Sequence, residues 1–224
     1  LRKLDQSGWP KHPLLIFTSN SFLADDVFKT WAASKTEQGS KLVIGQHGGH
    51  FGTAPFAFHE EHQIEISDRW LSWGWRKPHL EKITQCFKFS SVGRKVRYDK
   101  TGGALLVTMV LPRYSYHLYA VPIASQWLDY YADQQEFIGA LPENIKSQIT
   151  VRLSQQDFGW DHYTRWSDQS SKVKIDLGNV DINSLIRRSR IYISTYNATT
   201  YLESLKANIP TIIFWNPKHW ELNN

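Results

Sequence analysis

Short apolar runs alternate with amphipathic stretches along most of this 224-residue chain. Runs rich in β-branched and aromatic side chains predict buried strands, and apolar residues three or four positions apart predict helices that pack on a sheet. The pattern predicts strands at 14–17, 41–45, 68–75, 104–111, 149–153, 173–177, 191–194 and 211–215. It predicts helices at 25–33, 123–141, 181–188 and 198–207.

Strands that alternate with helices are typical of parallel sheets in α/β proteins. We therefore predict an α/β fold with two Rossmann-like doubly wound lobes, the first of them incomplete. The expected boundaries are a first lobe within 1–78, a connector at 79–100 and a second lobe at 101–224. The chain starts without methionine or a signal peptide, and we expect the complete protein to extend beyond both ends.

The segment Arg190–Trp215 is predicted to form a strand, a crossover helix and a second parallel strand. Its turn carries Thr195, Tyr196, Asn197 and Thr199 at the end of the first strand. Polar side chains and free N–H groups at such a turn are typical of phosphate binding. Simple helix capping also explains these residues, because every strand-to-helix turn needs a cap. The chain contains neither a G-x-G-x-x-G fingerprint nor a P-loop motif, so neither type of nucleotide site is predicted.

A second unusual stretch, Gln46–Gly52, places three glycines around His47 and His50 directly after a predicted strand. Glycines allow a ligand to approach the backbone closely, which favours a functional role for His47 over a packing role. The three-residue spacing of the histidines could suit a metal, but no third ligand is evident, so no metal site is predicted. The carboxylates that follow most closely in sequence are Glu60, Glu61, Glu65 and Asp68.

Composition narrows the function classes only in part. The formal charge of +5 is spread along the chain, which argues against a nucleic-acid-binding protein. It is compatible with an anionic small substrate and with peripheral contact at an anionic membrane such as the inner membrane. A single cysteine, Cys86, excludes an internal disulfide and fits a reducing cytoplasm.

Four motifs together resemble a bacterial family of surface-carbohydrate transferases: FTSNSF, GQHGGHFG, SDRWLSWGW and ISTYNATTYLESLKANIPTIIFWNPKHWEL. The resemblance covers residues 14–75 and 104–222. It implies a two-domain glycosyltransferase of the GT-B type. More distantly, the chain is similar to transferases that pass the acidic sugar Kdo from CMP-Kdo to capsule or lipopolysaccharide. The expected partners are therefore a nucleotide-sugar donor, with CMP-Kdo as the first candidate, and a carbohydrate acceptor, without a further cofactor.

The resemblance and the residue pattern together suggest roles for individual side chains. Asp68 is expected to act on the sugar as nucleophile or general base, with Glu61 as the next candidate, while His47 contacts the donor. Asp68 could equally be a turn residue that opens a strand. The residues expected to bind the donor are His50, Arg113, Thr195, Tyr196, Asn197, Thr199 and Glu203. Glu203 could bond a ribose hydroxyl or merely favour the start of a helix.

Two other readings of the sequence remain. A GT-B-like phosphotransferase or nucleotide-sugar epimerase would use the same nucleotide pocket, so the residues separate it poorly from a glycosyltransferase. A non-catalytic carbohydrate-binding module belongs to a different class of function. The polar turns at several strand ends argue against such a module, because a scaffold does not need them.

Overall fold

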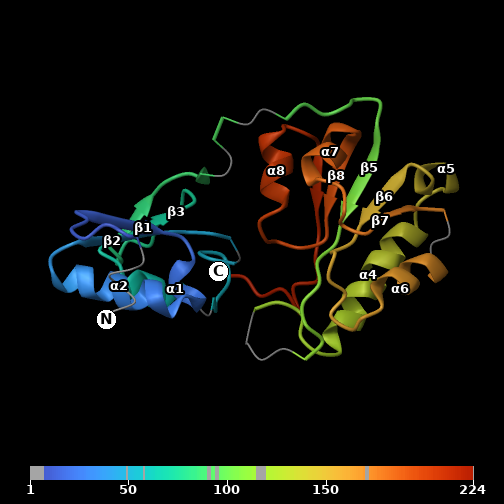
Figure 1. Ribbon diagram of the computed structural model, residues 1–224. Helices are drawn as coiled ribbons and strands as arrows, with labels where there is room; N and C mark the ends of the chain where they lie inside the picture. The colour runs from blue at the N-terminus through green and yellow to red at the C-terminus, as the bar shows by residue number, and fades with distance from the viewer. Residues whose placement is uncertain are drawn as a thin grey trace. The chain divides into compact units, whose positions relative to one another are not determined.

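The computed structural model describes residues 8–48, 50–57, 59–89, 92–93, 96–114, 120–169 and 172–223 (Figure 1). The chain divides into two compact units. Unit 1 comprises Leu1–Gly52 and Ala57–Ser90, and unit 2 comprises Thr53–Phe56 and Ser91–Asn224. Each unit contains its own parallel sheet with helices between the strands, so the predicted α/β, Rossmann-like fold is confirmed.

Unit 1 contains a parallel four-stranded sheet in the order β1-β2-β3-β4. Its helices α1 and α2 connect the first two strands, and α3 precedes the third. The strands are β1 (Leu15–Thr18), β2 (Lys41–Gly45), β3 (Arg69–Ser72) and β4 (Ile83–Gln85), and the helices are α1 (Ser21–Ala24), α2 (Asp26–Glu37) and α3 (Glu60–Ile66). Strand β4 lies within the segment predicted to be a connector, where its three residues are too few to show a period.

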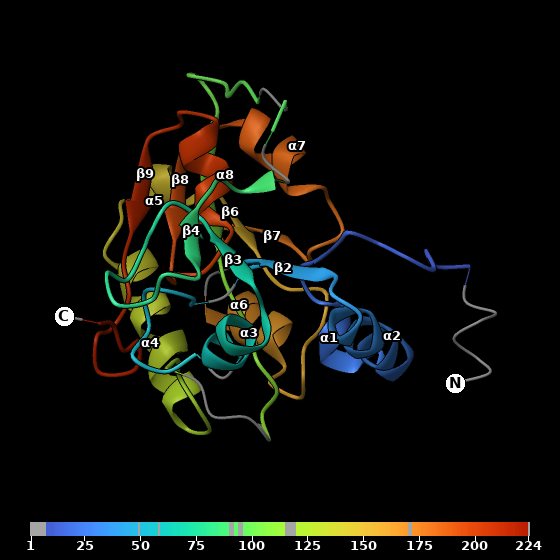
Figure 2. The same cartoon turned by 90° about the vertical axis from the view of Figure 1, so that its left-hand side faces the viewer.

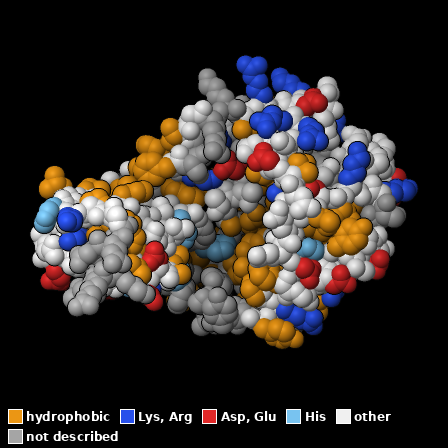
Figure 3. All heavy atoms as spheres, in the orientation of Figure 1, with side chains coloured by type: hydrophobic (Ala, Val, Ile, Leu, Met, Phe, Trp, Pro, Cys, Tyr) orange, Lys and Arg blue, Asp and Glu red, His pale blue; other side chains and the backbone are white. Residues whose placement is uncertain are grey.

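The two faces of this sheet differ. Ile16, Ile44 and Trp70 point into a core shared with the helices, and all three are buried. On the opposite face, Leu15 and Phe17 alternate with these core residues and remain 56% and 48% exposed, as the two-residue period of a strand requires. Figure 3 shows hydrophobic side chains gathered over the strands of unit 1.

Unit 2 contains a parallel five-stranded sheet in the order β7-β6-β5-β8-β9. Figure 1 shows α7 and α8 on one face of this sheet and α4, α5 and α6 on the other, which makes unit 2 doubly wound. Its strands are β5 (Gly103–Val107), β6 (Ile149–Arg152), β7 (Lys174–Asp176), β8 (Ser189–Ser194) and β9 (Thr211–Ile213). Its helices are α4 (Gln126–Gly139), α5 (Glu143–Lys146), α6 (His162–Gln169), α7 (Ile182–Arg187) and α8 (Tyr201–Lys206).

Helix α8 starts three residues later than the sequence predicts, at Tyr201 instead of Ala198. The preceding residues form a loop in which side chains bond to the backbone: the Ser194 hydroxyl donates to the Tyr196 carbonyl at 2.8 Å. Such local bonds compete with helix formation. In the part of the chain that is described, no helix has the length and apolar character needed to cross a membrane.

Candidate functional site

The strand order of unit 2 defines a topological switch point between β5 and β8. Strand β5 pairs with β6 on one side and with β8 on the other. After β5 the chain adds strands on one side of it and then crosses over to add strands on the other side. Ligands of open α/β sheets bind beside the carboxyl ends of the strands at such a point. Here these ends are Val107 of β5 and Ser194 of β8, which are paired with one another.

A chain of hydrogen bonds connects the residues at this switch point. The Thr195 hydroxyl donates to the Val107 carbonyl at 3.0 Å and pairs with the Tyr130 hydroxyl at 2.6 Å. The Met109 amide donates to the same Tyr130 hydroxyl at 2.9 Å. Burial raises the pKa of Tyr130 far above its ordinary value, so its hydroxyl stays protonated. The hydrogen bonds of the Thr195 side chain therefore connect β5, β8 and α4.

Asn197, two residues further on, lies in a different environment. Its side chain is buried, with 7% of the residue exposed, yet neither its amide nitrogen nor its carbonyl oxygen has a hydrogen-bond partner among the described residues. A buried amide without partners costs about 1–3 kcal/mol for each unsatisfied group. Native proteins rarely keep such a group without a water, a ligand or a functional reason.

Aromatic residues fix the loop that carries Asn197. The Tyr196 ring stacks on Trp220 with centroids 6.2 Å apart, and its hydroxyl pairs with the Thr200 hydroxyl. Trp220 also contacts Tyr130 of α4. Thr199 and Glu203, at the start of α8, are half-buried. Of the predicted donor-binding residues, those at 195–203 therefore gather at the carboxyl end of β8.

Arg113 lies beyond the carboxyl end of β5 and is exposed. Its guanidinium donates to the Gly159 carbonyl at 3.3 Å and lies 5.4 Å from the centre of the Trp160 ring. These contacts attach Arg113 to the loop after β6. Among the described residues, no hydrogen bond or ion pair joins it to the 195–200 loop.

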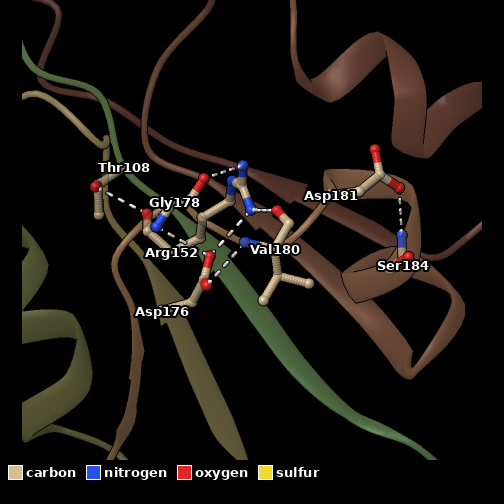
Figure 4. Close-up of polar contacts among 7 residues, drawn as sticks. All are labelled: Thr108, Arg152, Asp176, Gly178, Val180, Asp181 and Ser184. Atoms are coloured by element: carbon tan, nitrogen blue, oxygen red, sulfur yellow. Dashed lines mark hydrogen bonds and ion pairs between the residues drawn. The ribbon is translucent and has the colours of Figure 1, made fainter.

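A partly buried ion pair supports the neighbouring strands (Figure 4). Arg152, the last residue of β6, donates to the Asp176 carboxylate at 3.0 Å, to the Gly178 carbonyl at 3.3 Å and to the Val180 carbonyl. Asp176 in turn accepts from the Gly178 and Val180 amides. The pair fixes the loop after β7 that leads to Asp181, the N-cap of α7. Arg152 thus has the structural role that a strand-embedded arginine suggests.

In unit 1, the glycine-rich loop 46–52 follows the carboxyl end of strand β2. The Gln46 side-chain carbonyl accepts from the Trp73 amide at 2.9 Å and from the Trp75 indole at 3.0 Å. Glu60 is buried and accepts from the Gly52 amide at 2.6 Å and from Lys77 at 2.7 Å. Glu60 is one of the four candidate carboxylates in the sequence, and Gln46 opens the glycine-rich stretch, but only the folded loop brings their partners to them.

His47 emerges from this loop. The residue as a whole is exposed, and its ring centre lies 5.1 Å from that of Phe51. Partial burial of the ring lowers the pKa of His47 below its ordinary value of 6.5, and a hydrogen bond to the Ser19 backbone offsets part of this shift. A neutral imidazole at pH 7 can accept a proton. His50, in contrast, is buried at 8% exposure.

Asp68 lies at the amino ends of the strands, opposite the carboxyl ends where His47 lies. Its carboxylate accepts from the Leu42 amide and from Lys41, both at 2.9 Å, at the start of β2. The Leu42 amide, followed by Lys41, lowers the pKa of Asp68. Five strand residues, about 16 Å at 3.3 Å per residue, separate this point from His47 at the end of β2. Asp68 and His47 thus lie at opposite ends of β2, which argues against the hypothesis that they act in one site.

Glu61, the other predicted catalytic carboxylate, is exposed in the first turn of α3. Its neighbour Glu60 is the carboxylate that points inward to the glycine-rich loop. A search of the described residues finds no group of three or more His, Cys, Asp or Glu side chains that could hold a metal ion.

Comparison with known proteins identifies a family for the whole chain. The model of the LIC12162 family transferase matches residues 1–224. No protein with curated function matches the chain.

Proposed function

We propose, from the premise that the chain belongs to the LIC12162 family of transferases, that it transfers a sugar from a nucleotide donor to a bacterial surface carbohydrate. The family membership supports a transferase. The nucleotide sugar is our inference from the switch point of unit 2 and from the sequence resemblance described above. CMP-Kdo is the first donor to test. A cytoplasmic enzyme with peripheral contact at the inner membrane fits this substrate pair.

The observation that carries the proposal is the buried, unpartnered amide of Asn197 at the carboxyl end of β8. An asparagine amide offers two N–H donors and a carbonyl acceptor. A ribose hydroxyl or the edge of a nucleobase presents the matching acceptor and donor. Binding such a group would satisfy the amide and recover the free energy that its missing hydrogen bonds cost.

The donor phosphate is assigned to the loop 197–200 that leads into α8. Amide groups at the start of a helix have no partner within the helix and favour anions. The half-buried Thr199 adds a hydroxyl at this position. The Thr195 hydroxyl is already bonded within the protein, so it positions the loop and does not contact the phosphate.

For the proton transfer we propose His47. Glycosyl transfer needs a group that accepts a proton from the acceptor hydroxyl. Since its pKa is lowered, His47 is neutral near pH 7 and can serve as that base. We do not propose Asp68 or Glu61 for this role. The Asp68 carboxylate is hydrogen-bonded at the amino end of β2, and Glu61 is exposed on α3.

Titration calorimetry with CMP, CDP, UDP and GDP tests the donor site. We expect one nucleotide class to bind, and Asn197→Leu to weaken that binding about tenfold or more through loss of its hydrogen bonds. Asn144→Leu, on the exposed α5, is the matched control and should bind as the unaltered protein does. If no nucleotide binds, the proposed function fails. If Asn197→Leu binds normally, the donor lies elsewhere in the molecule.

A further inference from the structure

Unit 1 contains a groove between α2 and α3 that the proposed donor site does not use. Its volume is about 450 Å³, within the range of small-molecule sites. In Figure 2 both helices lie below β2 and β3. Leu42 of β2 contributes to the floor, Phe28, Ala32 and Ala33 of α2 line one wall, and His62 and Ile66 of α3 line the other.

The lining is apolar along most of the groove. Thr36 and Phe28, which both line it, are eight residues apart on α2, so the groove follows about 12 Å of helix. This length and the mainly hydrocarbon walls suit a flexible chain better than a compact sugar, which would leave its hydroxyls without partners.

The polar groups of the described lining are three basic side chains and the hydroxyls of Thr18 and Thr36. Lys29, His59 and His62 line the groove, and none of the described lining residues is acidic. Lys29 pairs with Asp26 at 2.8 Å, but the Asp26 side chain is 89% exposed. Such a surface ion pair contributes little free energy, so an anionic ligand can replace Asp26 as the partner of Lys29. The groove therefore favours a negative head group at the basic residues and an apolar chain along α2.

We propose that this groove binds a single-chain amphiphile with an anionic head group. The hydrocarbon chain lies between α2 and α3, and the head group contacts Lys29 together with the histidines of α3 and its N-terminal flank. The role of this ligand rests on the proposed function: it is the lipid part of the acceptor, held by unit 1. Its binding does not depend on the donor site, because the lining residues that the structure describes all belong to unit 1.

Calorimetric titration with sodium decanoate, kept below micelle-forming concentration, tests the site, with decyltrimethylammonium as the cationic probe of equal chain length. We expect decanoate to bind at least about tenfold more tightly than the cation. Lys29→Met, which keeps an apolar stem, should reduce this preference. Ala33→Trp, which fills the groove, should abolish binding of decanoate, whereas Ala24→Trp, an exposed alanine outside the groove, should not.

Two results would overturn the assignment. One is equal affinity for the anionic and cationic probes. The other is undiminished decanoate binding by Ala33→Trp when circular dichroism shows the native fold. Nucleotide affinity, measured on the same variants, should stay unchanged, because the donor site belongs to unit 2. Loss of nucleotide binding in Asn197→Leu and loss of decanoate binding in Ala33→Trp thus report separately on the two proposals.

Discussion

Among single residues, Thr195 and Asn197 lie in the same turn, but their polar side chains differ in their hydrogen bonds. The Thr195 hydroxyl has its partners within the protein, in Val107 and Tyr130. The Asn197 amide is buried to a similar degree and has none among the described residues. The first arrangement stabilises the fold, and the second keeps hydrogen-bonding capacity for a ligand.

Replacing these two residues should change stability in opposite directions. Asn197→Leu removes a buried unsatisfied amide, so the free energy of unfolding should rise by about 1 kcal/mol in the absence of ligand. Thr195→Val leaves the Tyr130 hydroxyl without its acceptor, and the free energy of unfolding should fall by about 1–2 kcal/mol. Urea denaturation measures both. A destabilised Asn197→Leu would mean that this amide is bonded in the folded protein.

The lowered pKa of His47 gives a second prediction at this scale. Because the folded-state pKa lies below 6.5, the folded protein resists protonation more than the unfolded chain does. The contribution of His47 to stability is therefore complete above pH 6.5 and declines as the pH falls below that value. NMR titration of the His47 ring should give a pKa below 6.5. A pKa at or above 6.5 would remove the argument for a neutral base.

Among the structural elements, the glycine-rich loop is closely packed at Gly52. Gly52 has a φ of 78°, and a Cβ atom built there would overlap the Trp75 ring. Its amide donates to the buried Glu60. These contacts connect the loop to helix α3 and to the segment after β3. His47 belongs to the same loop.

Gly52→Ala should therefore destabilise unit 1 more than a glycine replacement in open space. Gly39 is the matched control, since its φ of 99° is also positive but no atom lies within 4 Å of an added Cβ. We expect Gly39→Ala to cost about 1 kcal/mol from backbone strain alone. Gly52→Ala should cost about 2–4 kcal/mol, because steric overlap adds to the same strain. Thermal unfolding compares the two, and equal losses would contradict a tightly packed loop.

At the scale of the whole molecule, the chain carries separate cores. Ile44, Trp70 and Trp31 belong to the core of unit 1, whereas those of unit 2 lie on the two faces of its sheet, around Tyr192 and around Val151. Each unit has its own sheet and its own hydrogen-bonded ladder. Units of this kind can unfold in separate steps.

Arg152→Met tests this independence. It leaves the partly buried Asp176 without its cation, and because the Gly178 and Val180 amides still donate to the carboxylate, the cost should be about 2–3 kcal/mol, below that of a fully buried charge. The loss should appear in the unfolding transition of unit 2, while that of unit 1 keeps its midpoint. Hydrogen exchange, read at amides of β2 and of β6, separates the two. Equal loss of protection in both strands would show that the units unfold together.

Much of the fold was predictable because its signals are local. The apolar runs at Leu105–Val107 and Ile191–Ile193 identify buried parallel strands whatever surrounds them. The alternation of strands and helices predicts two parallel sheets. Strand β4 escaped prediction because three residues carry no period, and α8 was placed too early because bonds within the 194–200 loop outweigh helix propensity.

The order of residues also shows which turns are polar and glycine-rich, and hence that His47 and Asn197 follow buried strands. The partner of each polar group, however, depends on the folded chain. Folding placed Asp68 against Leu42 and Lys41 at the amino edge, gave Glu60 to the Gly52 amide, and left the Asn197 amide buried without a partner in the described chain. Strand pattern is encoded by neighbours in sequence, whereas hydrogen-bond partners far apart in sequence are fixed only when register and packing bring them together.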